Sequence, residues 1–240
     1  MRIVAVFLII GLLVSCAPVQ QTRDEQQATV QVEVTSMNQF LTTNDGTKIA
    51  YDYFAGAGTK GVVLVHQLPS NRKSWAQLVP KLQEKRWHVI AIDYRGRGES
   101  GGQLQSAQDY QNIGLDVDAA IEFLASKGVG SIAVVGASIG ANHAILAGDR
   151  DVRVNAVVLL SPGIDYRGVK TDVAAAKFTK ALFTAAAKDD AYAAESAQKI
   201  HDLAKGVKEL KIYDNAGHGT NMFVMPDLIP AIVNFVEKNI

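Results

Sequence analysis

A serine between two glycines is the first candidate for chemistry in this 240-residue sequence. Residues 134–142 read VVGASIGAN, which places Gly136, Ser138 and Gly140 in the pattern G-x-S-x-G. The apolar residues before the serine predict a strand, and those after it predict a helix. Glycines on either side allow a turn too tight for larger side chains, and such a turn lifts the serine hydroxyl above the sheet edge. Ser138 is therefore a candidate nucleophile.

A serine hydroxyl needs a base to take its proton and an acid to orient that base. His218 lies in YDNAGHGTNMF, after the last predicted strand, and two aspartates, Asp189 and Asp190, follow an earlier strand in AAAKDDAYAAES. The chain order Ser138, aspartate, His218 is the order in which a G-x-S-x-G serine meets its partners in an α/β sheet. The sequence thus predicts a catalytic triad, with either aspartate as the acid.

Strand and helix patterns alternate along the chain and must position these residues. Asn44-Asp45-Gly46 predicts a hairpin between two strands in FLTTNDGTKIAYDYF. GVVLVH is a continuous apolar run, which indicates a strand covered on both faces. Helical patterns include SWAQLVPKLQEKRW, despite Pro80, and residues 106–128, where Ser106 and Asp109 resemble a capping box. We predict an α/β fold with a mostly parallel eight-stranded sheet, helices on both faces and a mixed edge at the opening hairpin.

From about Phe40 to Ile240, the chain resembles the α/β-hydrolase superfamily, in its small esterase or dienelactone-hydrolase-like branch. The resemblance rests on GASIG, DAYAAES and AGHG, which stand along the chain in the family's order. It implies that Ser138 is the nucleophile and His218 the base. The family's acid is commonly followed by a small residue or proline and then a short helix, which favours Asp190 and keeps Asp189 as the alternative.

The segment VLVHQLPSNRKSW resembles the family's loop after the third strand. The resemblance implies that the backbone N–H groups of Leu68 and Ile139 form the oxyanion hole. Gln67 stands where the family usually has glycine. We expect this residue to adopt a negative φ and its side-chain amide to face the acyl pocket. There it would select small acyl groups. We interpret His66 as a structural loop residue, and the charges in DYRGRGES (93–100) as groups that hold loops together.

The resemblance implies a serine hydrolase that cleaves carboxylic esters through an acyl-enzyme. About twenty residues separate VVLLSP from ALFTAAAKD, too few for the multi-helix cap that many relatives insert there. We therefore expect no large cap, an open site and small or exposed acyl substrates. The alternatives are a thioesterase, lactonase or lysophospholipase of the same fold, or a lipoprotein that binds a ligand without catalysis.

Composition and motif searches argue against several other functions. The 24 basic and 24 acidic residues cancel, so there is no electrostatic reason to expect a nucleic acid partner. His88, His143 and His201 lack the spacing of metal ligands, and no glycine-rich phosphate loop follows the first strand. We expect neither a metal nor an organic cofactor.

The N-terminal residues MRIVAVFLIIGLLVSC have the basic start and short apolar run of a signal peptide. Leu13 to Cys16 resembles the lipobox of bacterial lipoproteins, in which the cysteine receives a diacylglycerol group. A general secretory signal with a chance cysteine is the alternative. We expect a signal peptide over 1–15, a lipid anchor at Cys16, a tether over 16–37 and the hydrolase domain over 38–240. The protein would be anchored to a membrane of the cell envelope, and Ala17 favours the outer membrane if the host is Gram-negative.

Overall fold

The computed structural model describes residues 39–240, so the predicted signal peptide, Cys16 and the tether lie outside the described residues. Eight strands form one sheet in the order β1-β2-β4-β3-β5-β6-β9-β10. The last six in that order are parallel to one another, whereas β1 and β2 run antiparallel to their neighbours at one edge. This confirms the predicted mostly parallel sheet with a mixed edge. The strands are β1 (Phe40–Thr42), β2 (Lys48–Phe54), β3 (Lys60–Val65), β4 (His88–Ile92), β5 (Ser131–Ala137), β6 (Val154–Leu160), β9 (Ala181–Ala187) and β10 (Lys208–Tyr213).

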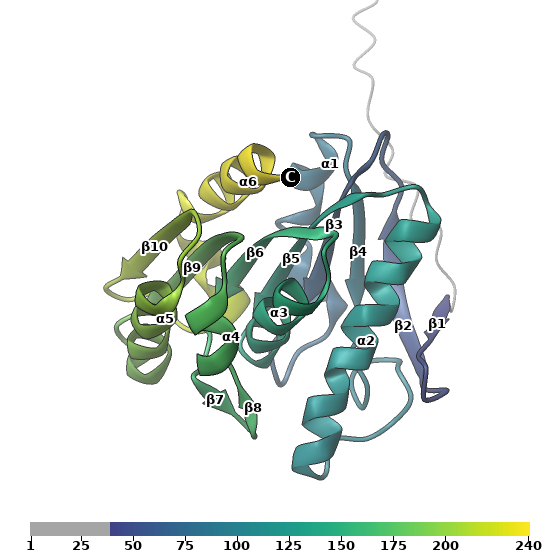
Figure 1. The fold of residues 1–240 in the computed structure, drawn as a ribbon, viewed down its shortest axis with the longest axis horizontal. Helices are drawn as coiled ribbons and strands as arrows, with labels where there is room; N and C mark the ends of the chain where they lie inside the picture. Colours follow the sequence, from purple (N-terminus) through teal and green to yellow (C-terminus); the bar gives the residue numbers. More distant parts are fainter. Residues whose placement is uncertain (1–38) are drawn as a thin grey trace, which may run out of the picture. The chain divides into compact units, whose positions relative to one another are not determined.

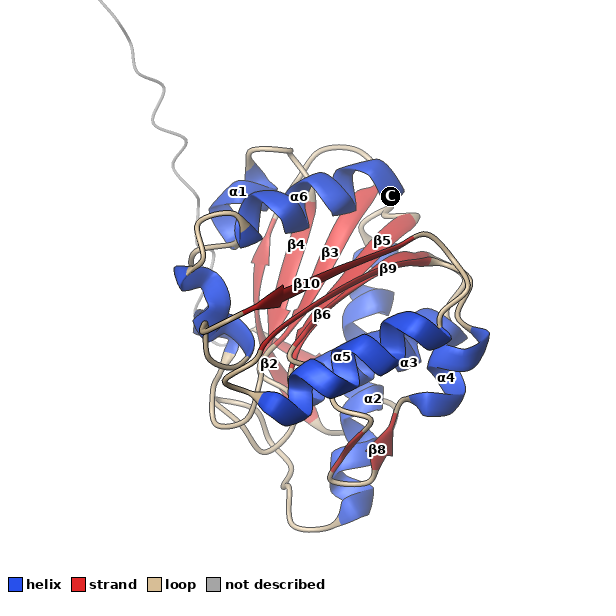
Figure 2. Cartoon of the chain, turned by 90° about the vertical axis from the view of Figure 1, so that its left-hand side faces the viewer, coloured by secondary structure: helices blue, strands red, loops and turns tan. Residues whose placement is uncertain are grey.

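Helices cover both faces of this sheet (Figures 1 and 2). One face carries α1 (Val79–Gln83) and α6 (Leu228–Asn239), and the other carries α2 (Ala107–Ser126), α3 (Ile139–Arg150) and α5 (Ala191–Leu203). A buried apolar core lies on each face, as expected for strands that are apolar on both sides. None of the helices within residues 39–240 is both long and apolar enough to cross a membrane.

Three segments differ from the sequence prediction. The helix expected around Pro80 is divided into a 3₁₀ helix, η1 (Arg72–Trp75), and α1, because a proline without an N–H fits only the first turn of a helix. A small hairpin of β7 (Asp165–Tyr166) and β8 (Val169–Lys170) precedes α4 (Asp172–Lys177) between β6 and β9. A second 3₁₀ helix, η2 (Gly219–Val224), follows directly after His218.

Parallel strands place the loops that follow them at a single edge of the sheet, where α/β proteins build their sites. The loops after β3, β5, β6, β9 and β10 all lie at this edge, towards which the arrow of β10 points in Figure 2. They carry Gln67, Ser138, Ser161, Asp190 and His218, respectively. The topology therefore gathers residues that are up to 151 positions apart, as from Gln67 to His218.

Candidate active site

Ser138 lies at the turn between β5 and α3, with φ 55° and ψ −123°. A positive φ is costly for a residue with a side chain and persists only where its surroundings impose it. The neighbouring glycines do so. A Cβ on Gly136 would lie 2.1 Å from the Gly140 carbonyl oxygen, and one on Gly140 would lie 2.2 Å from the Val65 carbonyl oxygen. The G-x-S-x-G pattern is thus a steric requirement of this turn.

His218 lies directly before η2, and its Nδ1 is 2.5 Å from Oδ2 of Asp190. Asp190 in turn precedes the first residue of α5. The carboxylate of Asp189 points elsewhere and accepts hydrogen bonds from the N–H groups of Ala216 (3.2 Å) and Gly217 (3.1 Å). Of the two aspartates that the sequence left open, the structure brings Asp190 to His218. Asp189 instead holds the loop that precedes the histidine.

The end of β6 forms hydrogen bonds both with the turn that carries Ser138 and with the segment that follows His218. The Ser138 N–H donates to the Leu160 carbonyl (2.8 Å), and the Gly219 N–H donates to Oγ of Ser161 (2.9 Å). Ser161 itself adopts φ 50° and is fully buried. Adjacent residues of one strand end therefore bind the segments that carry Ser138 and His218, which places both side chains at this point of the sheet edge.

Tyr166, on the β7–β8 hairpin, borders both side chains. Its ring meets the His218 imidazole edge-on, with 6.4 Å between centroids, and its hydroxyl lies beside the Ser138 side chain while donating to the Ser161 carbonyl (3.3 Å). Burial, together with the negative charge of Asp190, raises the pKa of the Tyr166 phenol, which stays protonated. A Cβ on Gly163 would lie 2.7 Å from this ring, so the glycine makes room for it. Ser138 is only 7% exposed.

Asn142 and Tyr192 fix the hairpin that carries Tyr166. The buried Asn142 amide, one turn after Ser138, donates to the Val169 carbonyl (2.7 Å) and accepts from the Gly163 N–H (3.0 Å). The Tyr192 hydroxyl donates to the Asp165 carbonyl and accepts from the Asp165 N–H, both at 2.9 Å. Tyr166 and Asn142 are not predictable as site residues from a motif in the sequence. The only available signal was glycine at 163 and 168, which marks a constrained loop.

Leu68 and Ile139 are the residues predicted to supply the oxyanion hole. Leu68 follows β3, and Ile139 is the first residue of α3, whose N–H has no partner within the helix. The close approach of Gly140 to the carbonyls of Val65 and His66 holds the start of α3 against the loop that contains Leu68. Within residues 39–240, the Leu68 N–H donates to no acceptor. Among the described residues, neither N–H group is therefore engaged by a backbone acceptor, and their role as an oxyanion hole stays a prediction.

Gln67 does not adopt a positive φ, so this turn has no need of the family's glycine. Its side chain lines the cavity beside His218, as expected, but its amide oxygen accepts from both the N–H (3.1 Å) and the hydroxyl (3.0 Å) of Thr220. The amide oxygen therefore points to η2 and not into the acyl pocket. Its role in this geometry is to hold the segment that follows His218.

His66 and the charges in 93–100 lie where the sequence suggested, in contacts between loops. His66 Nδ1 donates to the Gln67 carbonyl (2.8 Å), its ring stacks on Tyr94 at 4.1 Å, and burial lowers its pKa to about 4. Such a histidine stays neutral and is no second base. Asp93 binds both the N–H (2.6 Å) and the guanidinium of Arg72, which also binds Asp52 and Glu99.

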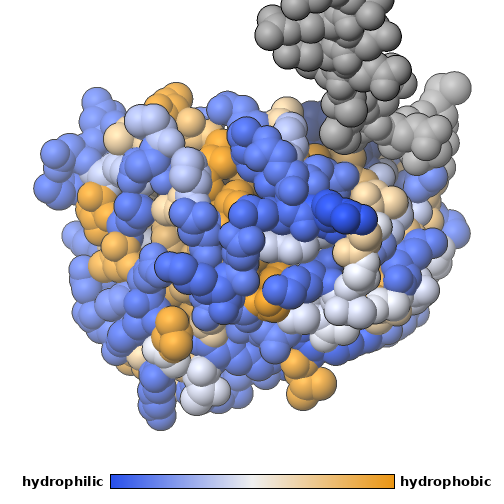
Figure 3. Space-filling model, turned by 90° about the horizontal axis from the view of Figure 1, so that it is seen from above, coloured by the Kyte–Doolittle hydropathy of each residue, from blue (hydrophilic) through white to orange (hydrophobic). Residues whose placement is uncertain are grey.

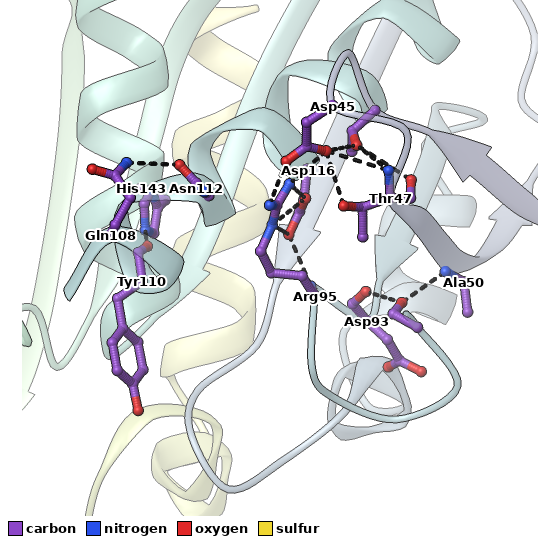
Figure 4. A network of polar contacts seen from close by, with 12 residues as sticks. Asp45, Thr47, Ala50, Asp93, Arg95, Gln108, Tyr110, Asn112, Asp116 and His143 are labelled. Atoms are coloured by element: carbon purple, nitrogen blue, oxygen red, sulfur yellow. Dashed lines mark hydrogen bonds and ion pairs between the residues drawn. The ribbon is translucent and has the colours of Figure 1, made fainter. Parts of the chain in front are cut away.

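A second buried ion pair joins Arg95 to Asp116 of α2 at 2.8 Å, and Arg95 also contacts Asp45 in the β1–β2 turn (Figure 4). Burial raises the pKa of Asp116 to about 6, although Arg95 acts in the opposite direction. The pairs of Arg95 join the loop after β4 to α2 and to the β1–β2 turn. None of them includes Ser138.

A cavity of about 750 Å³ opens beside His218, between the loop after β3 and η2. Gln67, Leu68, Ser74, Gln77 and Thr220 contribute to its walls. Nowhere in the described part of the chain do three or more His, Cys, Asp or Glu residues gather in a way that could hold a metal ion.

Comparison with known proteins agrees with this fold. The sequence model of the alpha/beta hydrolase fold matches residues 61–183. The structure is similar to the Pyrococcus furiosus esterase Pf2001 (TM-score 0.74, 20% identity, 87% of this chain and 94% of the other). It is also similar to an esterase from Exiguobacterium antarcticum (TM-score 0.68, 18% identity, 84% and 100%) and to an acetyl xylan esterase from Paenibacillus sp. R4 (TM-score 0.70, 18% identity, 84% and 83%).

Among curated proteins, an uncharacterized hydrolase of Bacillus subtilis, YugF, is 29% identical over 105 residues. The aligned part spans 44% of this chain and 37% of the relative. The likeness to the solved structures extends over most of the chain and concerns the fold. The match of the family model extends from β3 through the Ser138 turn and β6. The chain belongs to the alpha/beta hydrolase fold family.

Proposed function

We propose that this protein is a serine hydrolase of the carboxylesterase type, in which Ser138 is the nucleophile, His218 the general base and Asp190 the acid that orients it. The observation that carries the proposal is the 2.5 Å contact between His218 Nδ1 and Asp190, made where the end of β6 also binds the Ser138 turn. An imidazole held through Nδ1 by a carboxylate presents Nε2 to a nucleophile in the geometry that acyl transfer requires.

The chemistry would proceed in two steps. His218 Nε2 takes the proton of Ser138 as Oγ attacks the ester carbonyl carbon, and the oxyanion accepts hydrogen bonds from the N–H groups of Leu68 and Ile139. The C–O bond to the alcohol then breaks, and the alcohol leaves with the proton from His218. Water attacks the acyl-enzyme in the same way and releases the acid. One oxyanion donor contributes about 3 kcal/mol to such a transition state.

The substrates we propose are esters with small or exposed acyl groups. The connection between β6 and β9 holds only the β7–β8 hairpin and the six-residue α4, which leaves the cavity beside His218 open to solvent. Three proteins of the same fold are described as esterases, one of them as an acetyl xylan esterase, and this favours ester hydrolysis over other acyl transfers.

A fluorophosphonate probe tests the proposal, because it reacts only with an activated serine. We expect it to label the wild-type protein and not Ser138→Ala, while a Ser126→Ala control, on the exposed end of α2, is labelled normally. Hydrolysis of p-nitrophenyl acetate should follow the same pattern. A folded wild-type protein that is neither labelled nor active would identify the chain as a non-catalytic binder.

We also propose that the protein is attached to a membrane of the cell envelope through a lipid on Cys16. The support comes from the sequence: a short apolar run precedes the one cysteine of the chain. Two acyl chains suffice for stable anchoring. The wild-type protein should partition into the detergent phase, and Cys16→Ala should abolish this. A wholly soluble wild-type protein with an unmodified N-terminus would overturn the proposal.

A further inference from the structure

A cavity of about 410 Å³ lies between α2, α3 and β8, and its walls include neither Ser138, Asp190 nor His218. We call it the α2–α3 cavity. The hollow between α1 and α6, on the face seen in Figure 3, is lined mostly by apolar residues. Most residues around the α2–α3 cavity are instead polar or charged, which suits a ligand that forms hydrogen bonds. They include Gln108, Asn112, Asp118, His143, Arg150 and Lys170.

His143 brings an unpartnered acceptor atom to this cavity. Its Nε2 lies 2.9 Å from the Tyr110 carbonyl oxygen, which can only accept, so Nε2 carries the hydrogen. Burial lowers the pKa of His143 to about 3, so the ring is neutral and Nδ1 is unprotonated. His143 is 2% exposed, and Nδ1 has no hydrogen-bond partner among the described residues. Buried polar atoms nearly always have a partner, so Nδ1 points to a donor supplied from outside the chain.

Gly114 keeps a space open beside this nitrogen. It lies inside α2, where glycine stabilises a helix less than alanine does. A Cβ on Gly114 would lie 3.7 Å from both His143 Nδ1 and Arg150 Nη2, which is an ordinary contact distance. Packing among the described residues therefore does not require glycine at this position. The space that glycine leaves lies between an unprotonated nitrogen and a guanidinium group.

A hydroxyl group matches that space because it both donates and accepts hydrogen bonds. It can donate to His143 Nδ1 and accept from the Arg150 guanidinium. A carboxylate only accepts and would leave Nδ1 unpartnered, and the positive charges of Arg150 and Arg95 disfavour an ammonium group here. Water has the same hydrogen-bonding capacity as a hydroxyl, so a test needs a ligand whose other groups water cannot replace.

The outer part of the α2–α3 cavity indicates what those other groups are. Arg150 is paired with Asp118 at 2.8 Å, and Lys170 of β8 adds a further positive charge. On α2, Nε2 of Gln108 donates to Oδ1 of Asn112 at 2.8 Å (Figure 4). This leaves the Gln108 carbonyl and the Asn112 amino group to pair with a ligand. Such amide groups pair with hydroxyls, and the lysine pairs with an anion.

We propose that the α2–α3 cavity is a binding site for a polyhydroxylated carboxylate, the chemistry of a sugar acid. One hydroxyl lies beside Gly114 between His143 Nδ1 and the Arg150 guanidinium, further hydroxyls bind the amides of Gln108 and Asn112, and the carboxylate faces Lys170. The site is separate from Ser138 and His218, so its existence does not depend on the proposed esterase activity.

Calorimetric titration of the full chain with three matched compounds tests the proposal. Gluconate carries both hydroxyls and a carboxylate, sorbitol carries hydroxyls without the charge, and hexanoate carries the charge without hydroxyls. We expect gluconate to bind at least about tenfold more tightly than either of the others, since each lacks hydrogen bonds that gluconate makes. Absence of gluconate binding, or equal binding of sorbitol or hexanoate, would overturn the proposal.

Three variants locate the binding. Gly114→Ala should raise the melting temperature, because alanine favours the helix, and should weaken gluconate binding at least about tenfold, because its methyl group fills the space beside Nδ1. Lys170→Gln should weaken binding severalfold, while Lys238→Gln, an exposed lysine of α6, leaves it unchanged. If Gly114→Ala binds gluconate as the wild type does, the space beside Nδ1 holds water only and the proposal is wrong.

The ¹⁵N resonances of the imidazole rings give a direct readout at His143. They are assigned by their loss in His143→Gln. On addition of gluconate, we expect the Nδ1 resonance of His143 to move to lower frequency, as an unprotonated ring nitrogen does when it accepts a hydrogen bond. The same shift should occur in Ser138→Ala, which excludes binding at the triad as its cause. A shift confined to His218 would place the ligand at the candidate active site and contradict the proposal.

Discussion

Asp190 contacts Nδ1 of His218 at 2.5 Å, although its neighbour Asp189 lies one residue away in the same loop. The two carboxylates have separate partners: Asp190 binds an imidazole, and Asp189 binds the backbone N–H groups of Ala216 and Gly217. In the proposed reaction, Asp190 would stabilise the charged histidine, whereas Asp189 holds the loop that carries it.

Exchange of each aspartate for asparagine should separate these roles. Asp190→Asn removes the negative charge and supplies an N–H to Nδ1, which favours the wrong imidazole tautomer, so we expect kcat to fall by about a thousandfold or more. Asp189→Asn keeps an oxygen for the two N–H groups and should cost about tenfold or less. Kinetics with p-nitrophenyl acetate, with circular dichroism to verify folding, will decide. The opposite ranking would assign the acid to Asp189.

Tyr166→Phe tests the hydroxyl that lies between Ser138 and Ser161. The variant keeps the ring against His218 and loses the hydrogen bond to the Ser161 carbonyl. The side chain of Ser161 also accepts a hydrogen bond from the Gly219 N–H. Because this hydrogen bond is neutral and 3.3 Å long, we expect kcat to fall about twofold to tenfold with little change in KM. Tyr53→Phe, in which β2 loses a hydroxyl contact with His88 of β4, is the control. Equal kcat values for Tyr166→Phe and wild type would limit Tyr166 to a steric role.

The sequence predicts those parts of the site whose requirements are local. The turn at Ser138 needs small residues at 136 and 140 because of contacts within a few residues and with the adjacent strand, and this leaves a recognisable pattern. The choice between Asp189 and Asp190 depends on how one loop turns, and two adjacent carboxylates give the same signal. The alternation of strands and helices likewise predicts the sheet, since buried parallel strands are apolar throughout.

The parts that could not be predicted depend on tertiary contacts. Tyr166 reaches the site because Arg167 and Gly168 both adopt positive φ values in the β7–β8 turn. Such turns are recognised from Asn-Gly or Asp-Gly pairs, and Arg-Gly gives no comparable signal. Gln67 was assigned to the acyl pocket from its place in a family loop, whereas the Thr220 groups that bind it are 153 residues away. No local pattern contains that partner.

Gln67→Leu tests the contact with Thr220. The variant leaves the N–H and hydroxyl of the buried Thr220 without their acceptor, which costs about 1–3 kcal/mol in stability or in the position of the His218 segment. We expect a lower melting temperature and a lower kcat. Gln67→Glu, which keeps an acceptor oxygen, should retain more stability. Both variants should show the acyl-length profile of the wild type. A shift towards longer chains would instead mean that Gln67 limits the acyl pocket.

His143 should make the stability of the protein depend on pH. It lies in α3, 2% exposed, and donates through Nε2 to the Tyr110 carbonyl at 2.9 Å (Figure 4). Its Nδ1 has no hydrogen-bond partner among the described residues. Burial lowers its pKa from 6.5 to about 3, and the nearby Arg150 also disfavours the charged form. The folded protein therefore holds His143 neutral at pH values where the unfolded chain protonates it.

The sign of the effect follows from this difference. Above pH 6.5, His143 is neutral in both the folded and the unfolded protein, and its contribution to stability is fully present. As the pH falls from 6.5 towards about 3, His143 binds a proton in the unfolded chain only, and stability is lost. The loss is about 1.4 kcal/mol for each pH unit. His66, with a pKa near 4, acts in the same direction, and Asp116, raised to about 6, acts in the opposite one. Only a comparison of variants isolates His143.

His143→Gln provides that comparison, because its amide can donate to the Tyr110 carbonyl and does not titrate. Urea unfolding of both proteins should be measured at about pH 7 and about pH 5. We expect the wild type to lose about 2 kcal/mol more than the variant between these values, which is the cost of 1.5 pH units below the usual histidine pKa. The variant is less stable at pH 7, since glutamine fits the imidazole site imperfectly, but its stability falls less steeply. An identical loss in both proteins would mean that His143 accepts a proton in the folded state, and that its ring is less isolated from solvent than its contacts with Tyr110 and Gly114 indicate.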